Sequence, residues 1–217
     1  MGIFERIKNI EEGDYCSRAN LHSHSTYSDG KESFESLIQQ AQELGLEHFA
    51  ISDHNTVAGY LNNEYKKYDF LIPAVEFDCV MDFVLLHILG YGIDPECQEL
   101  QGFCAKSKAQ TAGDLTRLIY SRSPKQIIDA IHSAGGVAIL AHPCCCWAIS
   151  LKRFIQKLKD IGLDGVEVYY PYDRFRGVLK FHSKKSAHKV TEELGLLKTG
   201  GLDSHGKLEE RTGRRSE

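Results

Sequence analysis

Short apolar runs alternate with amphipathic segments along most of the chain. The apolar runs predict strands over residues 19–24, 48–52, 71–76, 83–89, 137–141, 165–170 and 196–201. Between them, apolar residues recur at helical spacing over residues 34–44, 124–134, 151–161 and part of 176–194. This alternation predicts one α/β domain covering residues 1–217, with helices between most of its strands.

Capping residues and glycines mark the ends of the predicted helices. Ser33 precedes the apolar stripe of residues 34–44, and Gly45 follows it. Ser123 and Pro124 form a cap and first-turn pair for the next long helix, which Gly135 ends. Most of the chain therefore consists of βα units.

Two regions depart from this alternation. Only residues 77–82 separate the third and fourth predicted strands, so we expect a short turn between them. Residues 94–122 have a weaker pattern and contain several cysteines, lysines and glutamines. We expect this segment to form a short, cap-like excursion over one end of the domain, between strands 4 and 5.

Residues able to bind metals lie at or just after the ends of the predicted strands. They are His22, His24, Asp29, His54, Glu76, His142, Asp203 and His205, and His87 can join them from late in the fourth strand. Because the loops after parallel strands form one face of such a domain, we expect these side chains to lie close together. Imidazoles and carboxylates are ligands that suit borderline divalent ions.

Residues 20–30 hold the first of these candidate ligands. In an extended strand alternate side chains share a face, so His22 and His24 point the same way and can bind one cation. Asp29 follows in the next loop. A His-x-His pair alone also fits solvent-facing histidines, so the metal hypothesis depends on the ligands downstream.

Composition limits the classes of function. With 217 residues and 42% hydrophobic content, the chain can bury a core as a single domain. Its net charge of −4 disfavours a permanent nucleic-acid partner, although a local basic groove is compatible with that average. The chain has no apolar run of membrane-spanning length, and residues 1–14 lack an apolar signal core. We expect a cytoplasmic protein without a membrane partner.

The seven cysteines do not form the pattern of a disulfide framework. Their number is odd, and Cys144, Cys145 and Cys146 are adjacent, so reduced thiols are expected. Two roles are open for the adjacent cysteines: binding zinc or sensing redox state beside the metals, or packing as small apolar residues beside Trp147. We favour packing, since the spacing lacks the Cys-x-x-Cys of structural zinc sites.

The ordered motifs resemble those of the polymerase and histidinol phosphatase (PHP) family of metal-dependent phosphoesterases. They are His22-x-His24 with Ser28-Asp29-Gly30, Ser52-Asp53-His54, Pro73-Ala74-Val75-Glu76, His87 before Leu89-Gly90-Tyr91, Ala141-His142-Pro143 and Gly201-Leu202-Asp203-Ser204-His205. They span residues 20–206, nearly the whole chain. The resemblance implies a distorted seven-stranded (β/α)7 barrel that binds up to three divalent metal ions, which are manganese, zinc or iron, with magnesium also possible.

The resemblance also implies how the ligands divide among three metals. One metal would take His22, His24, Glu76 and Asp203; the second Glu76, His87 and His142; the third Asp29, His54 and His205. A carboxylate that bridges two ions, here Glu76, is a natural way to hold them close together. Asp53 is expected to orient a neighbouring ligand and not to bind metal itself.

The expected activity is hydrolysis of a phosphomonoester by an activated water, without a serine or cysteine nucleophile. The substrate would be a small phosphorylated metabolite or a nucleotide, including a nucleoside 3′,5′-bisphosphate or the end of a short oligonucleotide. The alternative is a non-catalytic, metal-binding module with a structural or regulatory role in a larger assembly. The complete ligand set favours the enzyme.

Candidate substrate-binding residues follow from position and charge. Arg174, Arg176 and His182 lie between the Tyr-rich strand end and the last strand; Lys106, Lys108 and Arg117 lie in the excursion. Tyr169, Tyr170 and Tyr172 fit either base stacking or packing at the rim of the barrel. The excursion is shorter than the corresponding insertion of related enzymes, so we expect an open, shallow pocket.

Overall fold

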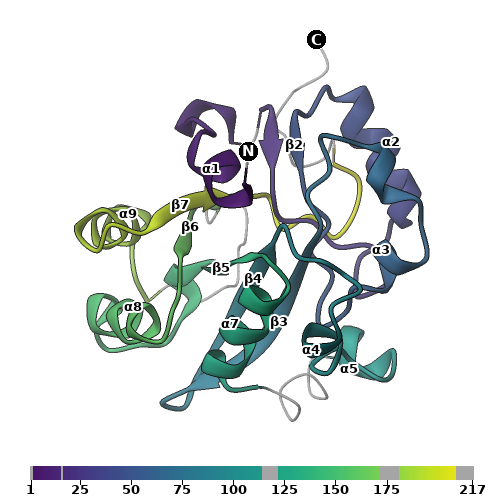
Figure 1. The fold of residues 1–217 in the computed structure, drawn as a ribbon. Coiled ribbons are helices and arrows are strands. Elements are labelled where there is room, and N and C mark those ends of the chain that lie inside the picture. The colour runs from purple at the N-terminus through teal and green to yellow at the C-terminus, as the bar shows by residue number, and fades with distance from the viewer. Residues whose placement is uncertain (1, 16, 114–121, 172–180, 209–217) are drawn as a thin grey trace.

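The computed structural model describes residues 2–15, 17–113, 122–171 and 181–208, and the strands within these ranges form two sheets (Figure 1). The strands are β1 (Ala19–Asn20), β2 (His48–Phe49), β3 (Ala74–Met81), β4 (Val84–Tyr91), β5 (Val137–Leu140), β6 (Gly165–Tyr169) and β7 (Leu197–Gly200). Each corresponds to one of the predicted strands. The alternation of apolar runs with helices was therefore a correct guide to the α/β class.

The two sheets differ in size and direction. Strands β1 and β2 pair in parallel, while the larger sheet has the order β3-β4-β5-β6-β7. Strand β4 is antiparallel to both β3 and β5, and β5, β6 and β7 are parallel to one another. The continuous seven-stranded barrel that we expected is not seen in the described part of the chain.

Single bridges connect the two sheets on both sides. The pairs Phe49–Leu71 and His54–Glu76 join the β2 segment to the β3 segment. On the other side, Ser23 bridges to Ser204, which follows β7. The small sheet thus lies between the two edges of the large one, and its strand ends meet those of β3 and β7.

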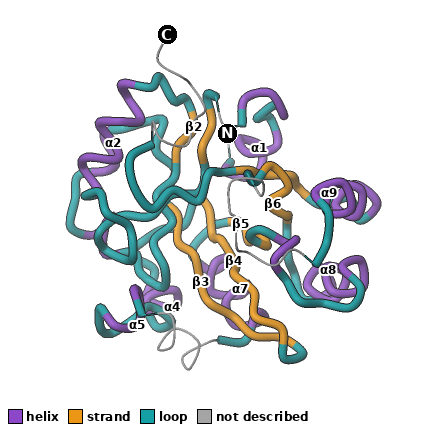
Figure 2. Tube along the Cα trace, turned by 180° about the vertical axis from the view of Figure 1, so that it is seen from behind, coloured by secondary structure: helices purple, strands orange, loops and turns teal. Residues whose placement is uncertain are grey.

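The turn between β3 and β4 is shorter than predicted. Strand β3 continues through residues 77–81, and the chain reverses at Asp82 and Phe83, whose φ angles are 51° and 63°. Two successive residues with positive φ are typical of the two-residue turns that match the twist of a β-hairpin. The hairpin projects from the body of the molecule (Figures 1 and 2), and Phe83 at its tip is fully exposed.

The four long helices begin and end near their predicted boundaries. They are α2 (Phe34–Glu43), α7 (Pro124–Ser133), α8 (Leu151–Asp160) and α9 (Lys184–Glu193). The hydroxyls of Ser33, Ser150 and Ser183 accept hydrogen bonds from first-turn N–H groups of α2, α8 and α9. Residues 176–180 of the predicted last helix lie outside the described residues.

Shorter helical segments complete the fold. They are α1 (Ile3–Lys8), α3 (Ala58–Leu61), α4 (Gln98–Gln101), α5 (Ala109–Ala112) and the 3₁₀ turns η1 (Glu12–Asp14), η2 (Tyr65–Lys67) and η3 (Pro143–Cys145). Helices α4 and α5 belong to the predicted excursion, and the Ala105 N–H donates to the carbonyl of Asn55 at 2.7 Å. The excursion therefore contacts the loop that carries His54. Residues 114–121 of it lie outside the described ranges.

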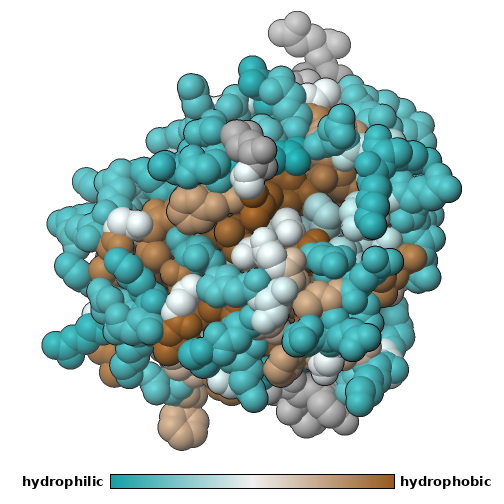
Figure 3. Space-filling model, viewed as in Figure 1, coloured by the Kyte–Doolittle hydropathy of each residue, from teal (hydrophilic) through white to brown (hydrophobic). Residues whose placement is uncertain are grey.

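Apolar side chains form two clusters. The larger packs the five-stranded sheet against α7, α8 and α9, and the smaller packs α2 against Phe49 and Leu71. Polar side chains cover most of the face shown in Figure 3, with apolar groups visible between them. Among the described helices, none has the length and apolar character needed to cross a membrane.

Candidate metal centre

Glu76 lies at the centre of the predicted ligands and is almost completely buried. Its Oε2 lies 3.2 Å from His22 Nε2 and 3.3 Å from both His24 Nε2 and His54 Nδ1. Its Oε1 lies 2.9 Å from His87 Nδ1 and 3.2 Å from His142 Nε2. Five imidazoles thus converge on the two oxygens of one carboxylate, as expected for a bridging ligand.

The structure brings all nine predicted ligands together, in sets close to the expected ones. The sets are Glu76, His87 and His142; His22, His24 and Asp203; and His24, Asp29, His54 and His205. In each set, one donor atom per residue lies within 4.8 Å of the others. The sets differ from the expected division in three ways. Glu76 is grouped only with His87 and His142, His24 belongs to two sets, and Asp78 forms a fourth set with His54 and His87.

The environment of His24 fits a cation. Both ring nitrogens are buried and lack a well-formed hydrogen bond to any described residue, although Nε2 lies 3.0 Å from Asp203 Oδ1 and Nδ1 lies 3.8 Å from Asp29 Oδ1. Buried polar atoms in proteins are almost always satisfied, and an ion between imidazole and carboxylate groups would satisfy these. The donor set is the mixture that manganese, zinc and iron accept.

Backbone conformation and close packing position several ligands. His142 and Asp203 follow β5 and β7 with φ angles of 27° and 48°, a left-handed region that few residues other than glycine adopt. Such conformations persist only where the surrounding structure holds them, and they cluster at functional sites. Gly201 allows the chain to pass His22, because a Cβ at Gly201 would lie 2.3 Å from the His22 Cβ.

Two ligands occupy positions that the sequence pattern did not predict. Glu76 is the third residue of the long strand β3 and not its last. His87 is the fourth of eight residues in β4, where it pairs with Asp78. Because β4 is antiparallel to its neighbours, His87 reaches the site through this register and not by lying near a strand end.

Two outer carboxylates, missed by the sequence reasoning, hold inner ligands. Glu167, fully buried on β6, lies 2.9 Å from His22 Nδ1 and accepts the backbone N–H of His142 at 2.9 Å. Asp78 Oδ1 lies 3.1 Å from His87 Nε2. The imidazoles of His22 and His87 therefore each lie between Glu76 and an outer carboxylate, an arrangement that fixes ring orientation and tautomer. The sequence signal for Glu167 was a charge within the apolar strand 165–169.

Asp53 acts on the loop between two ligands. Its carboxylate accepts hydrogen bonds from the Ser25 N–H at 2.7 Å, the Ser25 hydroxyl at 2.6 Å and the Ser28 hydroxyl at 2.6 Å. The Lys108 ammonium of the excursion donates to the carbonyls of Thr26 and Ser28. The segment between His24 and Asp29 is thus held from two directions, and Lys108 contacts this loop.

The remaining candidates for substrate binding lie in different environments. Tyr170 is buried and its hydroxyl donates to Asp203 Oδ2 at 2.8 Å, while Tyr169 stacks on Tyr15 with 4.9 Å between ring centroids. Both therefore pack within the protein. His182 Nε2 lies 2.7 Å from the carbonyl oxygen of Ala148 and is not among the grouped ligands. Tyr172, Arg174, Arg176 and Arg117 lie outside the described residues, and Lys106 is exposed.

The adjacent cysteines behave largely as predicted. Cys144 and Cys146 are buried in the large apolar cluster, and Cys145 is half-buried. No cysteine joins a potential metal-binding group among the described residues. Trp147, however, is 63% exposed and does not share the buried environment of Cys144 and Cys146.

Charge pairing dominates the electrostatics of the cluster. Burial alone would raise the pKa of Glu76, but the imidazoles of His54, His22 and His87 lower it well below its usual value. Burial likewise opposes protonation of His87, yet Glu76 and Asp78 raise its pKa to about 10. The pKa of His142 is raised to about 9 against the same effect of burial, with Cys145 and Glu76 hydrogen-bonded to its ring.

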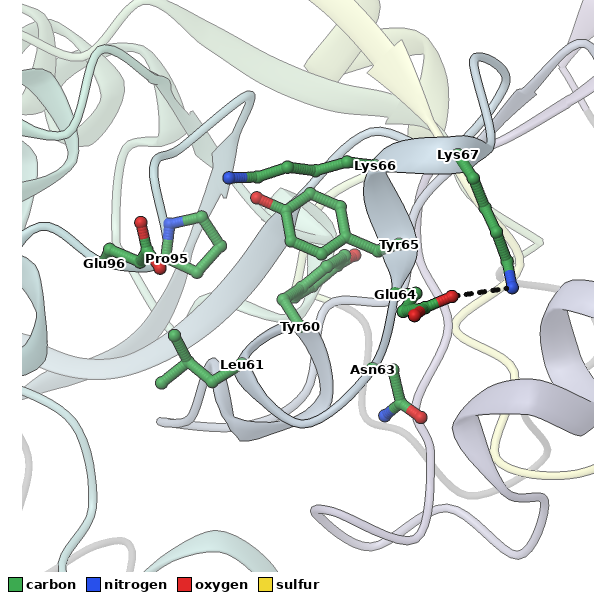
Figure 4. A pocket seen from close by; sticks show the side chains of 9 residues that line it. All are labelled: Tyr60, Leu61, Asn63, Glu64, Tyr65, Lys66, Lys67, Pro95 and Glu96. Carbon is green, nitrogen blue, oxygen red and sulfur yellow. Dashed lines mark hydrogen bonds and ion pairs between the residues drawn. The ribbon is translucent and has the colours of Figure 1, made fainter.

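A separate pocket lies between α3, η2 and Pro95 (Figure 4). Tyr60 and Tyr65 form its wall, and Glu64 and Lys67 at its edge pair with each other at 3.4 Å. None of the nine predicted ligands lines it. The ligand cluster therefore remains the candidate site for chemistry.

Comparison with known proteins gave a family match and several relatives. The model of the PHP domain matches residues 20–196. The chain is 31% identical to the 5′-3′ exoribonuclease Rnm of Escherichia coli, over 73% of this chain and 77% of that protein. It is 24% identical to the phosphoribosyl 1,2-cyclic phosphate 1,2-diphosphodiesterase of Eggerthella lenta, over 87% of this chain and 94% of that protein.

The fold also resembles a solved structure. A putative metal-dependent phosphoesterase from Bifidobacterium adolescentis superposes with a TM-score of 0.69, covering 89% of each chain. At 20% sequence identity this likeness concerns the fold alone.

We expect Glu76→Gln to remove two metal equivalents, because its two oxygens face different ligand sets, and Asp29→Asn to remove one. Metal analysis of the purified variants by mass spectrometry checks this. Glu43→Gln, on the outer part of α2, serves as the control and should retain the full complement. A loss of only one equivalent from Glu76→Gln would contradict the bridging position.

We expect Glu167→Gln to weaken metal binding by about 10- to 100-fold while leaving the nine ligands in place. An amide keeps the volume of the carboxylate but orients the His22 ring less strongly and makes its other nitrogen a weaker metal ligand. Competition with a fluorescent chelator measures the affinity, with Glu192→Gln on the surface of α9 as the matched control. Equal affinities of both variants would show that Glu167 does not position His22.

We expect metal binding to release protons and to strengthen as pH rises toward about 10, where both imidazoles have lost their protons. In the metal-free chain the raised pKa values of His87 and His142 keep both imidazoles protonated at neutral pH, and a protonated imidazole cannot bind a metal. Calorimetric titration in buffers of different ionisation enthalpy counts the protons released. An affinity that does not change with pH would contradict protonation of His87 and His142 in the metal-free chain.

Proposed function

Because the chain belongs to the PHP domain family of metal-dependent phosphoesterases, we propose that it hydrolyses phosphomonoesters of nucleotides. Nucleoside 3′,5′-bisphosphates and the ends of short oligonucleotides fall within this class. The observation that supports the proposal most strongly is the convergence of five imidazoles on the buried carboxylate of Glu76.

The nine converging residues would hold the metals in the three sets described. Divalent ions bound there supply positive charge that stabilises a phosphoryl group and lowers the pKa of water. The protein's part is to fix the ligands and to limit water around them. Glu167 and Asp78 orient His22 and His87, Tyr170 holds Asp203, and Asp53 holds the loop before Asp29.

Burial strengthens these electrostatic effects. His22, His24 and Glu76 have exposed fractions of 0%, 0% and 1%, so the interior side of the cluster is shielded from solvent. Asp29, His87 and His205 keep side-chain exposures of 21%, 27% and 30%. The solvent-facing side of the cluster is therefore the side from which a phosphate ester would enter.

The relatives favour nucleotide-like substrates over other phosphate esters. Exoribonuclease and phosphoribosyl cyclic phosphate diesterase are the activities named for two of them, and both concern phosphates on ribose. These names include diester cleavage, so monoester preference is a separate part of the proposal. The partly exposed side of the cluster is compatible with a terminal phosphate.

We expect the metal-loaded chain to release inorganic phosphate from mononucleotides or nucleoside 3′,5′-bisphosphates faster than from sugar phosphates or histidinol phosphate. Short oligoribonucleotides and bis-aryl phosphate, a diester, belong in the same panel. Chelation should abolish release, and added manganese should restore it, because the metals are expected to activate the attacking water. No serine or cysteine nucleophile is needed. Phosphate release is measured colorimetrically.

The Glu76→Gln and Glu43→Gln pair provides the matched control for this panel. Turnover should fall by several orders of magnitude in the first variant and remain in the second. Activity that survives chelation would overturn the metal-dependent mechanism. A full metal complement without turnover on any ester would favour a non-catalytic metal-binding module.

A further inference from the structure

Two aromatic side chains that contact each other, and an exposed isoleucine two residues from one of them, lie in connections close in sequence to the ligand His142. We call these three side chains the aromatic platform. Its members are Trp147, Ile149 and Phe181, with exposed fractions of 63%, 105% and 46%. The rings of Trp147 and Phe181 contact each other, with 4.7 Å between centroids and 42° between planes. Exposed side chains of this size that cluster commonly mark binding surfaces.

The platform lies beyond the carboxyl-terminal ends of β5 and β6, on the side where His142 also lies. Trp147 and Ile149 belong to the loop between β5 and α8, five and seven residues after His142. Phe181 belongs to the connection between β6 and α9, and its N–H donates to the carbonyl of Cys144 at 3.0 Å. Because β5 and β6 are parallel, both connections begin at the carboxyl-terminal ends of neighbouring strands.

The path from the metal centre to the platform is short. Three of the residues between His142 and Trp147 form the 3₁₀ turn η3, so the two Cα atoms are on the order of 10–15 Å apart. The His182 imidazole, bonded to the carbonyl of Ala148, fastens the start of α9 to the same loop. Two hydrogen bonds, from Phe181 and from His182, thus join the connection after β6 to the loop that follows His142.

Three exposed cations follow the platform residues closely in sequence. Arg153 lies in the first turn of α8, and Lys184 and Lys185 lie in the first turn of α9; neither turn contains an acidic residue. All three side chains are exposed, and none pairs with a carboxylate among the described residues. Anions are favoured near helix starts, so these exposed cations add to a surface that favours anions.

We propose that the aromatic platform and these cations bind a single-stranded oligonucleotide whose terminal phosphate lies at the metal centre. Single-strand binding surfaces combine aromatic faces, on which bases stack, with cations that follow the phosphodiester backbone. The inference rests on the proposed function, which places the terminal phosphate at the metals. It extends that function by identifying where the rest of the strand is held.

A single strand fits this surface better than a mononucleotide or a protein partner. Tyr169 and Tyr170, which lie nearer the ligands, are 8% and 5% exposed and offer no free face to a base. The exposed ring of Trp147 follows η3, where a nucleotide beyond the terminal one would lie. A protein partner would explain the apolar side chains but not the cations that follow them in sequence.

The test measures strand binding separately from hydrolysis. The probe is a 5′-phosphorylated hexauridylate with a 3′-fluorescein label and phosphorothioate linkages, which slow its cleavage. It is mixed with the metal-loaded full-length chain. Fluorescence anisotropy gives Kd at several salt concentrations. We expect Trp147→Ala to raise Kd about tenfold, Trp147→Phe to restore most of the affinity, and Lys184→Gln with Lys185→Gln to flatten the salt dependence.

Controls distinguish the platform from general surface effects. Phe83→Ala removes an even more exposed aromatic side chain at the hairpin tip and should leave Kd unchanged. Metal content and melting temperature of Trp147→Ala should equal those of the unaltered chain, which shows that the fold is intact. Uridine monophosphate should compete only weakly with the hexamer, since it cannot reach the platform while its phosphate lies at the metals.

The outcomes separate this proposal from the proposed function. Hexamer binding that depends on Trp147, without hydrolysis of any ester, supports the platform and rejects the enzyme. Hydrolysis with a Kd that is insensitive to Trp147 and to the lysines overturns the platform and leaves the enzyme. Concentration-dependent self-association that Trp147→Ala abolishes would also overturn the platform, since it would assign the surface to a second copy of the chain.

Discussion

The rest of the structure depends on burying one carboxylate among imidazoles. Removing Glu76 from water is costly unless polar or oppositely charged groups surround it, and nitrogens of five imidazoles lie 2.9–3.3 Å from its two oxygens. These imidazoles come from segments that follow β1, β2 and β5 and from β4, so their convergence requires the two sheets to meet. The single bridges between the sheets, including His54–Glu76, lie where this charge cluster is formed.

A second layer of polar groups makes the convergence precise. Glu167 and Asp78 contact the outer nitrogens of His22 and His87, and Asp53 holds the loop before Asp29. The excursion contributes through Lys108, whose ammonium binds the same loop. A segment that the sequence pattern describes only as a weak cap is therefore part of the support for the ligands.

Periodicity was enough to predict the α/β class and the long helices, because both depend on local spacing. The nine converging residues were predicted from their places near strand ends and from the order of the motifs. Register was not predictable in this way. The apolar pattern of residues 71–89 fits a turn at several positions, and only pairing across the hairpin decides that Asp78 faces His87. Glu167 was missed because a buried carboxylate in a strand becomes meaningful only when its partners are known. The sheet division was missed because β1 and β2 pair over only two residues each.

The hairpin of β3 and β4 gives the cluster an order of assembly. Glu76, Asp78 and His87 lie within twelve residues of one another and meet through a two-residue turn, so bringing them together costs little loop entropy. Asp203 and His205 are separated from Glu76 by more than half of the chain and can join only after β5, β6 and β7 have paired. The hairpin thus brings together two of the nine predicted ligands, Glu76 and His87, and the others join through longer-range pairing. We expect the hairpin to form early in folding, with closure of the last strand completing both the fold and the cluster.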